Sequence, residues 1–295
     1  MGRMRGIFLL VVFLLGLSLG LSPALRAQSK EDSGKGLIWY ESVIGTSSSL
    51  GTVTRFDSTV GYNFNRHFGV DFGVPFLFVH ASSSTTTTLR SANGIGDIYT
   101  DLRFTLRNPA VNFISTLRGA APTGSTSNGF STGRATVNWN NHFDRTFGRV
   151  TPYAELGLAN TAPDTAYFVR PSTTLGLTGH FEGGAALQLA RLLNFHASVY
   201  AIEPAGQQKV FSKFLNRTSA PTVPASHGRF FQTAPETVGS ADIARDHGFS
   251  LGFDSRPFRA VDLAIGYTRS ATFDLNTLYF GVGFNLARLL GSSSH

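Results

Sequence analysis

The chain has 295 residues with 15% charged side chains, 32 glycines, 36 aromatic residues (26 Phe, 8 Tyr and 2 Trp) and no cysteine. A charged fraction so far below the about 25% of average soluble proteins argues against a helical or α/β enzyme, and the lack of cysteine excludes disulfides, thiolate metal sites and a cysteine nucleophile. The formal charge is +7, and it falls to +4 (22 basic and 18 acidic residues) when the three arginines of residues 1–27 are left out. The other arginines are scattered along the chain and form no basic stripe, so we expect no nucleic-acid partner.

Residues 1–27 predict a secretory signal peptide. Arg3 and Arg5 precede an apolar run of 15 residues at 7–21, and small and polar residues then lead to Ala27. The run is shorter than the roughly 20 residues that a spanning helix needs. We expect cleavage after Ala27, followed by a periplasmic segment over residues 28–36.

From residue 37 onward, apolar side chains recur at every second position, which is the period of a β-strand. Phe or Val stands at each even position from 68 to 78, with small or polar residues between them over 69–75. Most such segments have 10 to 14 residues, a length that suits a tilted strand crossing a bilayer better than a soluble strand of about 5 to 6 residues. Twelve segments follow the pattern, at 37–46, 51–64, 68–80, 96–107, 111–121, 132–143, 149–160, 172–190, 195–203, 247–255, 260–269 and 275–285.

The connections alternate between tight turns and longer polar loops. The longer ones, at 81–95, 122–131, 161–171 and 204–246, all fall on one side, although the short connections at 47–50 and 270–274 also belong to that side. This plan is typical of outer-membrane barrels with short periplasmic turns and long external loops.

A secreted, soluble β-sandwich is the alternative, because it also alternates apolar and polar residues. Its solvent face would usually carry Lys, Glu and Arg, whereas the polar face here is rich in Gly, Ser, Thr, Ala and Asn. Lipid cannot satisfy an open sheet edge. We therefore predict an all-β fold: a closed antiparallel transmembrane β-barrel of about 12 strands over residues 37–286, with a C-terminal tail at 287–295, monomeric and located in the outer membrane of a Gram-negative bacterium.

Two short motifs add a family resemblance. Asn93-Gly94-Ile95-Gly96-Asp97-Ile98 opens the fourth predicted strand and Ala121-Pro122-Thr123-Gly124 ends the fifth. With these motifs the chain resembles the outer-membrane proteins named for the MetA pathway of phenol degradation, over residues 60–285 by strand rhythm. The resemblance implies a barrel that transports small aromatic or hydrophobic compounds. The chain departs from the family in its 204–246 loop and in the tail after Phe284.

Some inward positions hold the residue types of a catalytic triad. His180, Glu182, His196 and Ser198 face inward, but the predicted hairpin sets His196 opposite residue 189, roughly 25 Å from His180 at about 3.3 Å per residue, too far for a triad. No metal spacing or phosphate-binding loop is present, so we expect no catalytic residue, metal or cofactor, and a protein that is not an enzyme.

Charged side chains on the inward face are the candidate lumen residues. They either pair across neighbouring strands and hold the barrel shape, or they line a narrow polar conduit, for which twelve strands leave an intermediate interior. The candidates are Arg55, Asp57, Asp71, Asp97, Asp101, Arg103, Arg118, Arg134, Glu155, His180, Glu182, Asp254 and Asp262.

The loop at 204–246 is longer than a hairpin requires, and its phenylalanines exceed what a solvated linker contains. We expect Phe211, Phe214, Phe230 and Phe231 to cover the barrel mouth. Basic residues of the loop would then meet Glu182, Asp254 and Asp262, or the phosphates of lipopolysaccharide. The favoured function is passive passage of a small apolar or aromatic solute through a barrel whose other partners are outer-membrane lipid and lipopolysaccharide. The alternatives are a non-conducting structural or surface-binding barrel and a lipid-modifying enzyme.

Overall fold

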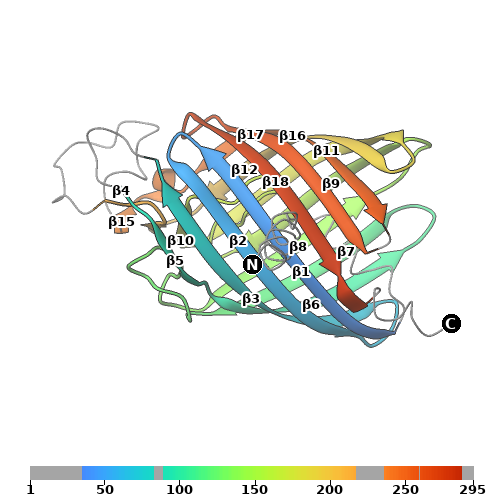
Figure 1. The fold of residues 1–295 in the computed structure, drawn as a ribbon, viewed down its shortest axis with the longest axis horizontal. Coiled ribbons are helices and arrows are strands. Elements are labelled where there is room, and N and C mark those ends of the chain that lie inside the picture. The colour runs from blue at the N-terminus through green and yellow to red at the C-terminus, as the bar shows by residue number, and fades with distance from the viewer. Residues whose placement is uncertain (1–34, 83–88, 217–235, 259, 288–295) are drawn as a thin grey trace, which may run out of the picture.

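The computed structural model describes residues 35–82, 89–216, 236–258 and 260–287. Within these residues, twelve long antiparallel strands form a closed, tilted barrel (Figure 1). The strands are β1 (Gly36–Ser48), β2 (Gly51–Asn63), β3 (Phe68–Ala81), β6 (Ile98–Arg107), β7 (Asn112–Ala121), β8 (Thr136–Asp144), β9 (Val150–Ala159), β11 (Thr178–Ala190), β12 (Leu193–Pro204), β16 (Asp246–Phe258), β17 (Val261–Ser270) and β18 (Leu275–Asn285). Consecutive strands pair along the chain, and the pairing of β1 with β18 closes the ring.

One barrel strand is interrupted. β5 (Ala92–Ile95) pairs with the external half of β3, and β6 pairs with the other half of the same strand. Gly96 and Asp97 separate the two pieces, so β5 and β6 act as a single member of the wall.

The side-chain alternation matches the predicted faces. The even positions of β3 point outward, where Phe72 and Phe78 are 50% and 51% exposed, and its odd positions, such as Asp71, are buried in the interior. An exposed apolar face around the whole closed wall is stable in lipid and not in water. The predicted transmembrane barrel is therefore confirmed, and the soluble β-sandwich is wrong.

The long connections gather at one end of the barrel and the tight turns at the other, as the sequence predicts. At the external end, β10 (Ser172–Leu175), β13 (Gln208–Ser212) and β15 (Glu236–Gly239) form a small separate sheet, and β4 (Leu89–Arg90) pairs with β14 (Leu215–Asn216). A short 3-10 helix, Ala241–Ile243, precedes β16.

Two sequence predictions need correction. The predicted strand at 172–190 divides, because β10 pairs with β13 instead of the barrel wall and only β11 belongs to the wall. His196 lies opposite Ala186 and not residue 189, because the turn is at Arg191 and Leu192, between the paired Ala190 and Leu193, and the register shifts by one residue between Gln188 and Ala190.

No helix in the described part of the chain has the length and apolar character to cross a membrane. The predicted signal peptide lies outside the described residues, as do Phe230 and Phe231. The position of the predicted cleavage site therefore stays a prediction.

Candidate functional site in the barrel lumen

Side chains leave part of the barrel interior unfilled along one side of the wall. A cavity of about 310 Å³ lies along the inner wall formed by β2, β3 and β6 to β9. Four successive inward positions of β7, namely Ile114, Thr116, Arg118 and Ala120, line this cavity. Since alternate residues advance about 6.6 Å along a strand, the cavity extends through much of the wall's height.

Cross-strand ion pairs cover this wall. Asp101 and Arg118 are directly opposite each other in the register, and both Arg118 Nε and Nη2 donate to the Asp101 carboxylate at 2.7 Å. Arg118 also lies over the Tyr99 ring, 3.8 Å from its centroid. Arg103 donates to Asn63 at 2.9 Å and lies 3.5 Å from the Asp71 carboxylate. These pairs hold their side chains against the wall and so leave space beside them.

A polar chain continues around the wall across β8, β9 and β11. Asn140 donates its amide to Glu155 at 2.6 Å, and its amide oxygen lies 3.0 Å from His180 Nε2. His142 lies between Glu155 and Asp144, at 3.4 and 3.5 Å. The wall of the cavity therefore carries polar and charged side chains on each of its strands, with the apolar side chains of Leu77, Ile114 and Phe130 between them.

The opposite side of the interior is filled by a loop. Residues 161–171 leave β9 and enter the lumen, where Tyr167 and Phe168 are buried. Tyr167 packs edge-on against Tyr279, with ring centroids 5.3 Å apart. Its ring lies so close to Gly252 and Gly266 that a Cβ at either position would come within 2.6 Å of it. These two glycines therefore make the space in the wall that the tyrosine occupies.

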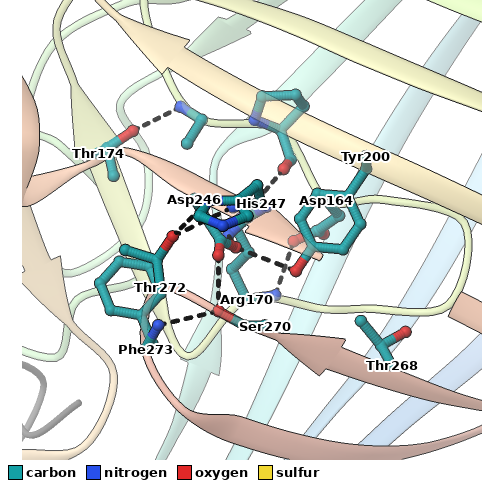
Figure 2. Close-up of polar contacts among 12 residues, drawn as sticks. Asp164, Arg170, Thr174, Tyr200, Asp246, His247, Thr268, Ser270, Thr272 and Phe273 are labelled. Carbon is teal, nitrogen blue, oxygen red and sulfur yellow. Dashed lines mark hydrogen bonds and ion pairs between the residues drawn. The ribbon is translucent and has the colours of Figure 1, made fainter. Parts of the chain in front are cut away.

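A buried ion pair fixes this loop to the wall (Figure 2). Arg170 Nη1 donates to Asp246 Oδ2 at 2.6 Å, and Asp246 also accepts from Tyr200 at 3.2 Å and from Ser270 at 2.6 Å. Within the loop, Asp164 accepts from the Arg170 amide at 2.8 Å. Because Asp246 is completely buried, these donors replace the water that the carboxylate loses on folding.

Further hydrogen bonds tie the loop to three more strands. Thr268 of β17 donates to the Tyr167 carbonyl at 3.0 Å, and Thr46 of β1 donates to the Val169 carbonyl at 3.2 Å. On β11, Glu182 accepts from the Ala166 amide at 3.4 Å. The loop is thus held along its length and not only at its ends.

The long external loop packs over this inward loop. The Lys213 amide donates to the Pro171 carbonyl and Lys213 Nζ donates to the Arg170 carbonyl, both at 2.9 Å. Burial lowers the pKa of Lys213 to about 8, although attraction from Asp164 opposes the shift. Phe211 and Phe214 are buried.

The two short motifs of residues 93–98 and 121–124 form one unit at the interruption between β5 and β6. Thr123 accepts from the Ile98 amide at 2.9 Å and donates to the Gly96 carbonyl at 3.0 Å. Asp97 accepts from the Gly124 amide at 3.0 Å. Residues 27 apart in sequence thus replace the ladder hydrogen bonds that the interrupted strand lacks.

The structure separates the predicted lumen residues into three groups. The first lines the cavity and comprises Arg55, Asp57, Asp71, Asp97, Asp101, Arg103, Arg118, Glu155 and His180. Glu182, Asp254 and Asp262 form the second group: they face inward but are buried among packed side chains, with partners that include Tyr153, Asn194 and Arg256. Arg134 is a correction, because it lies exposed in the loop before β8 begins at Thr136.

The predicted partners of the long loop also need correction. Lys213 lies beside Asp164 and Arg170, and Lys209 pairs with Glu236 at 3.1 Å, so neither meets Glu182, Asp254 or Asp262. The inward loop, including Asp164, Tyr167 and Arg170, is not predicted from the sequence. A Tyr-Phe-Val-Arg run between two prolines at 163 and 171 was the signal available, since such a run is unusually apolar for an external loop.

No group of three or more His, Cys, Asp or Glu side chains within the described residues is arranged to hold a metal ion. No family model matches the chain. No curated protein matches it either.

Solved outer-membrane proteins are similar to the chain in fold. A COG4313 outer membrane channel from Pseudomonas putida F1 is 12% identical, with a TM-score of 0.53 over 85% of this chain and 95% of that one. The NanC porin is 6% identical, with a TM-score of 0.47 over 84% of this chain and 99% of that one. The KdgM porin is 7% identical, with a TM-score of 0.45 over 83% and 98%. The fold is that of a bacterial outer-membrane β-barrel.

Proposed function

We propose that this protein is a passive outer-membrane channel whose path is the open side of the lumen. The observation that carries the proposal is the cavity beside the β2–β9 wall, which extends from Ile114 and His142 near the short turns to Phe130 and Lys213 at the external loops. Ion pairs along this wall hold the charged side chains out of the path. The inward loop, fixed by Arg170 and Asp246, sets the width of the path from the other side.

The lining favours small polar solutes over the apolar compounds that the family resemblance implies. A fully apolar solute would displace water from charged side chains without replacing its hydrogen bonds, which is unfavourable. Six carboxylates and four Lys or Arg side chains line the cavity, an excess of two acidic side chains over Lys and Arg. This excess favours cations modestly over anions, since charged walls raise the local concentration of ions of the opposite sign.

Planar bilayers and proteoliposomes test this proposal. We expect a small conductance in KCl, a reversal potential that indicates weak cation selectivity across a salt gradient, and faster liposome swelling in glycine or ethanolamine than in 1-butanol of similar size once the bilayer's own permeability is subtracted. A folded barrel that passes neither ions nor these solutes would instead support the non-conducting structural barrel.

A further inference from the structure

The periplasmic end of the barrel carries an arginine in each of four successive turns. Arg66 follows β2, Arg107 ends β6, Arg145 and Arg149 lie between β8 and β9, and Arg191 lies between β11 and β12. All five are exposed. We call Arg66, Arg145, Arg149 and Arg191, which lie in the turns themselves, the arginine rim.

An aromatic girdle places this rim relative to the membrane. Phe68, Phe104, Phe113 and Phe143 form a continuous row across β3, β6, β7 and β8, with successive ring centroids 5.1, 6.3 and 4.9 Å apart. Rows of aromatic side chains mark the membrane–water boundary of outer-membrane barrels. The row lies beside the turns, so the arginines are at the level of the lipid headgroups.

None of the four rim arginines forms an ion pair with an acidic side chain of the described residues. Arg66 donates to His67 at 3.0 Å, and Arg145 donates to the Ala110 carbonyl at 3.0 Å with its guanidinium 4.9 Å from the Phe147 ring centroid. The second of these contacts links two neighbouring turns. The guanidinium groups of Arg66 and Arg145 are thus positioned by partners that are not acidic, and they keep their charge available.

The external end is different. Among the described side chains there, three cations pair with acidic neighbours: Lys209 with Glu236 at 3.1 Å, Arg245 with Glu203 at 3.1 Å, and Arg269 with Asp274. Arg134 differs from these three, since it is exposed and no acidic side chain of the described residues pairs with it. Within the described part of the chain, exposed cations without an acidic partner are therefore concentrated at the periplasmic rim.

We propose that the arginine rim binds the phosphodiester headgroups of anionic glycerophospholipids in the periplasmic leaflet. A guanidinium group presents paired N–H donors that match two phosphate oxygens, and it is less strongly hydrated than an ammonium group. The aromatic girdle contacts the acyl chains of the same lipids just below.

Two matched variants test the proposal. The rim variant carries R66Q, R145Q, R149Q and R191Q, and the control variant carries R134Q, K209Q, R245Q and R269Q, so that each loses four positive charges. Phosphatidylglycerol is titrated into detergent-solubilised barrel, and bound lipid is counted by native mass spectrometry. We expect the control to bind like the wild type and the rim variant to bind at least about tenfold more weakly, the effect of losing one or two arginine contacts to anionic lipid.

The remaining arms identify the ligand and check the fold. Phosphatidylcholine should bind the wild type and the rim variant equally weakly, and lipopolysaccharide binding should not differ between them. A variant with the four arginines changed to lysine should recover only part of the phosphatidylglycerol affinity. Equal phosphatidylglycerol binding by the rim variant and the wild type, or a loss confined to lipopolysaccharide, would overturn the proposal. If the rim variant does not give the heat-modifiable band of a folded barrel, the double variant R145Q/R149Q replaces it. Unchanged phosphatidylglycerol affinity in that double variant would also overturn the proposal.

Discussion

The two sides of the lumen are built in opposite ways although both are made of inward-facing strand residues. On the β2–β9 side, most charged groups pair with partners on neighbouring strands and lie flat against the wall, as Asp101 and Arg118 do, although Arg55 pairs with Asp164 of the inward loop. On the side of β16 to β18, a loop fills the space, and its charge meets the wall through Arg170 and Asp246. The lumen stays open where the charged groups pair mainly within the wall, and it is filled where a loop is fixed to the wall by a buried ion pair.

The largest expected effect comes from releasing the loop. R170A leaves the buried Asp246 without its charged partner, and breaking a buried pair in this way costs about 3–5 kcal/mol. We expect the free energy of unfolding in urea to fall by that amount and the conductance to rise as the loop leaves the lumen. R245A, which breaks exposed pairs only, is the control. The double variant R170A/D246N should lose less than the sum of the single changes, and simple additivity would show that the two groups are not coupled.

The next effect comes from overfilling the packed side. In G266A, the new methyl group would lie 2.6 Å from a ring carbon of Tyr167, so the ring has to move. Overpacking of this kind costs about 1–3 kcal/mol, and we expect a smaller conductance increase than in R170A. G119A is the matched control, because a Cβ there meets nothing within 4 Å. If both alanine variants unfold at the same urea concentration, Tyr167 is not packed against the wall as described.

On the open side, substitutions should change selectivity and cost less stability than R170A. The Arg118 side chain is 37% exposed, so solvent screens its pair with the buried Asp101 more than it screens the fully buried pair of Arg170 with Asp246. We expect R118Q to increase the preference for cations and D101N to decrease it, because each removes one charge from the lining. Reversal potentials across a KCl gradient measure this. Shifts of the same sign in both variants would contradict the assigned path.

The smallest effect should appear with pH. The pKa of Lys213 is about 8 in the folded protein and 10.5 when unperturbed. The unfolded chain therefore binds more protons between these values, and the contribution of this residue to stability rises with pH across that window. The cavity also loses one positive charge as pH passes 8, so cation selectivity should increase between pH 7 and 9. K213M should abolish that change; a K213M channel with the wild-type pH response would assign the titration to another group.

Much of the wall could be predicted from residue order. The even positions 68 to 78 are apolar because they face lipid, and the odd positions 99, 101 and 103 hold Tyr, Asp and Arg because they face the lumen; both follow from a strand period of two. The length of the runs, most of which have 10 to 14 residues, then predicts the length of the strands. The alternation of short turns and long loops predicts which end of the barrel is external. Nine of the thirteen charged lumen candidates line the cavity for this reason.

The predictions of strand bounds and side-chain faces failed at the ends of the wall strands. Residues 172–190 read as one strand, but a short sheet outside the barrel removes 172–175 from the wall. Arg134 has the parity of an inward residue, but β8 does not begin until Thr136, so parity has no meaning there. Odd or even residue number indicates the face of a side chain only within a strand that is hydrogen-bonded to its neighbour. Where that pairing ends depends on the conformation of the adjoining loops.

The sequence by itself determined the closed barrel, its orientation and the charge of its lining, because alternation and loop length are local properties of the chain. The tertiary structure decided which side of the lumen is filled. Arg170 and Asp246 are 76 residues apart, and Tyr167 fits between glycines at 252 and 266 of two other strands. No local pattern encodes such pairings, since a buried charge and its partner come together only once the strands that separate them have closed the wall.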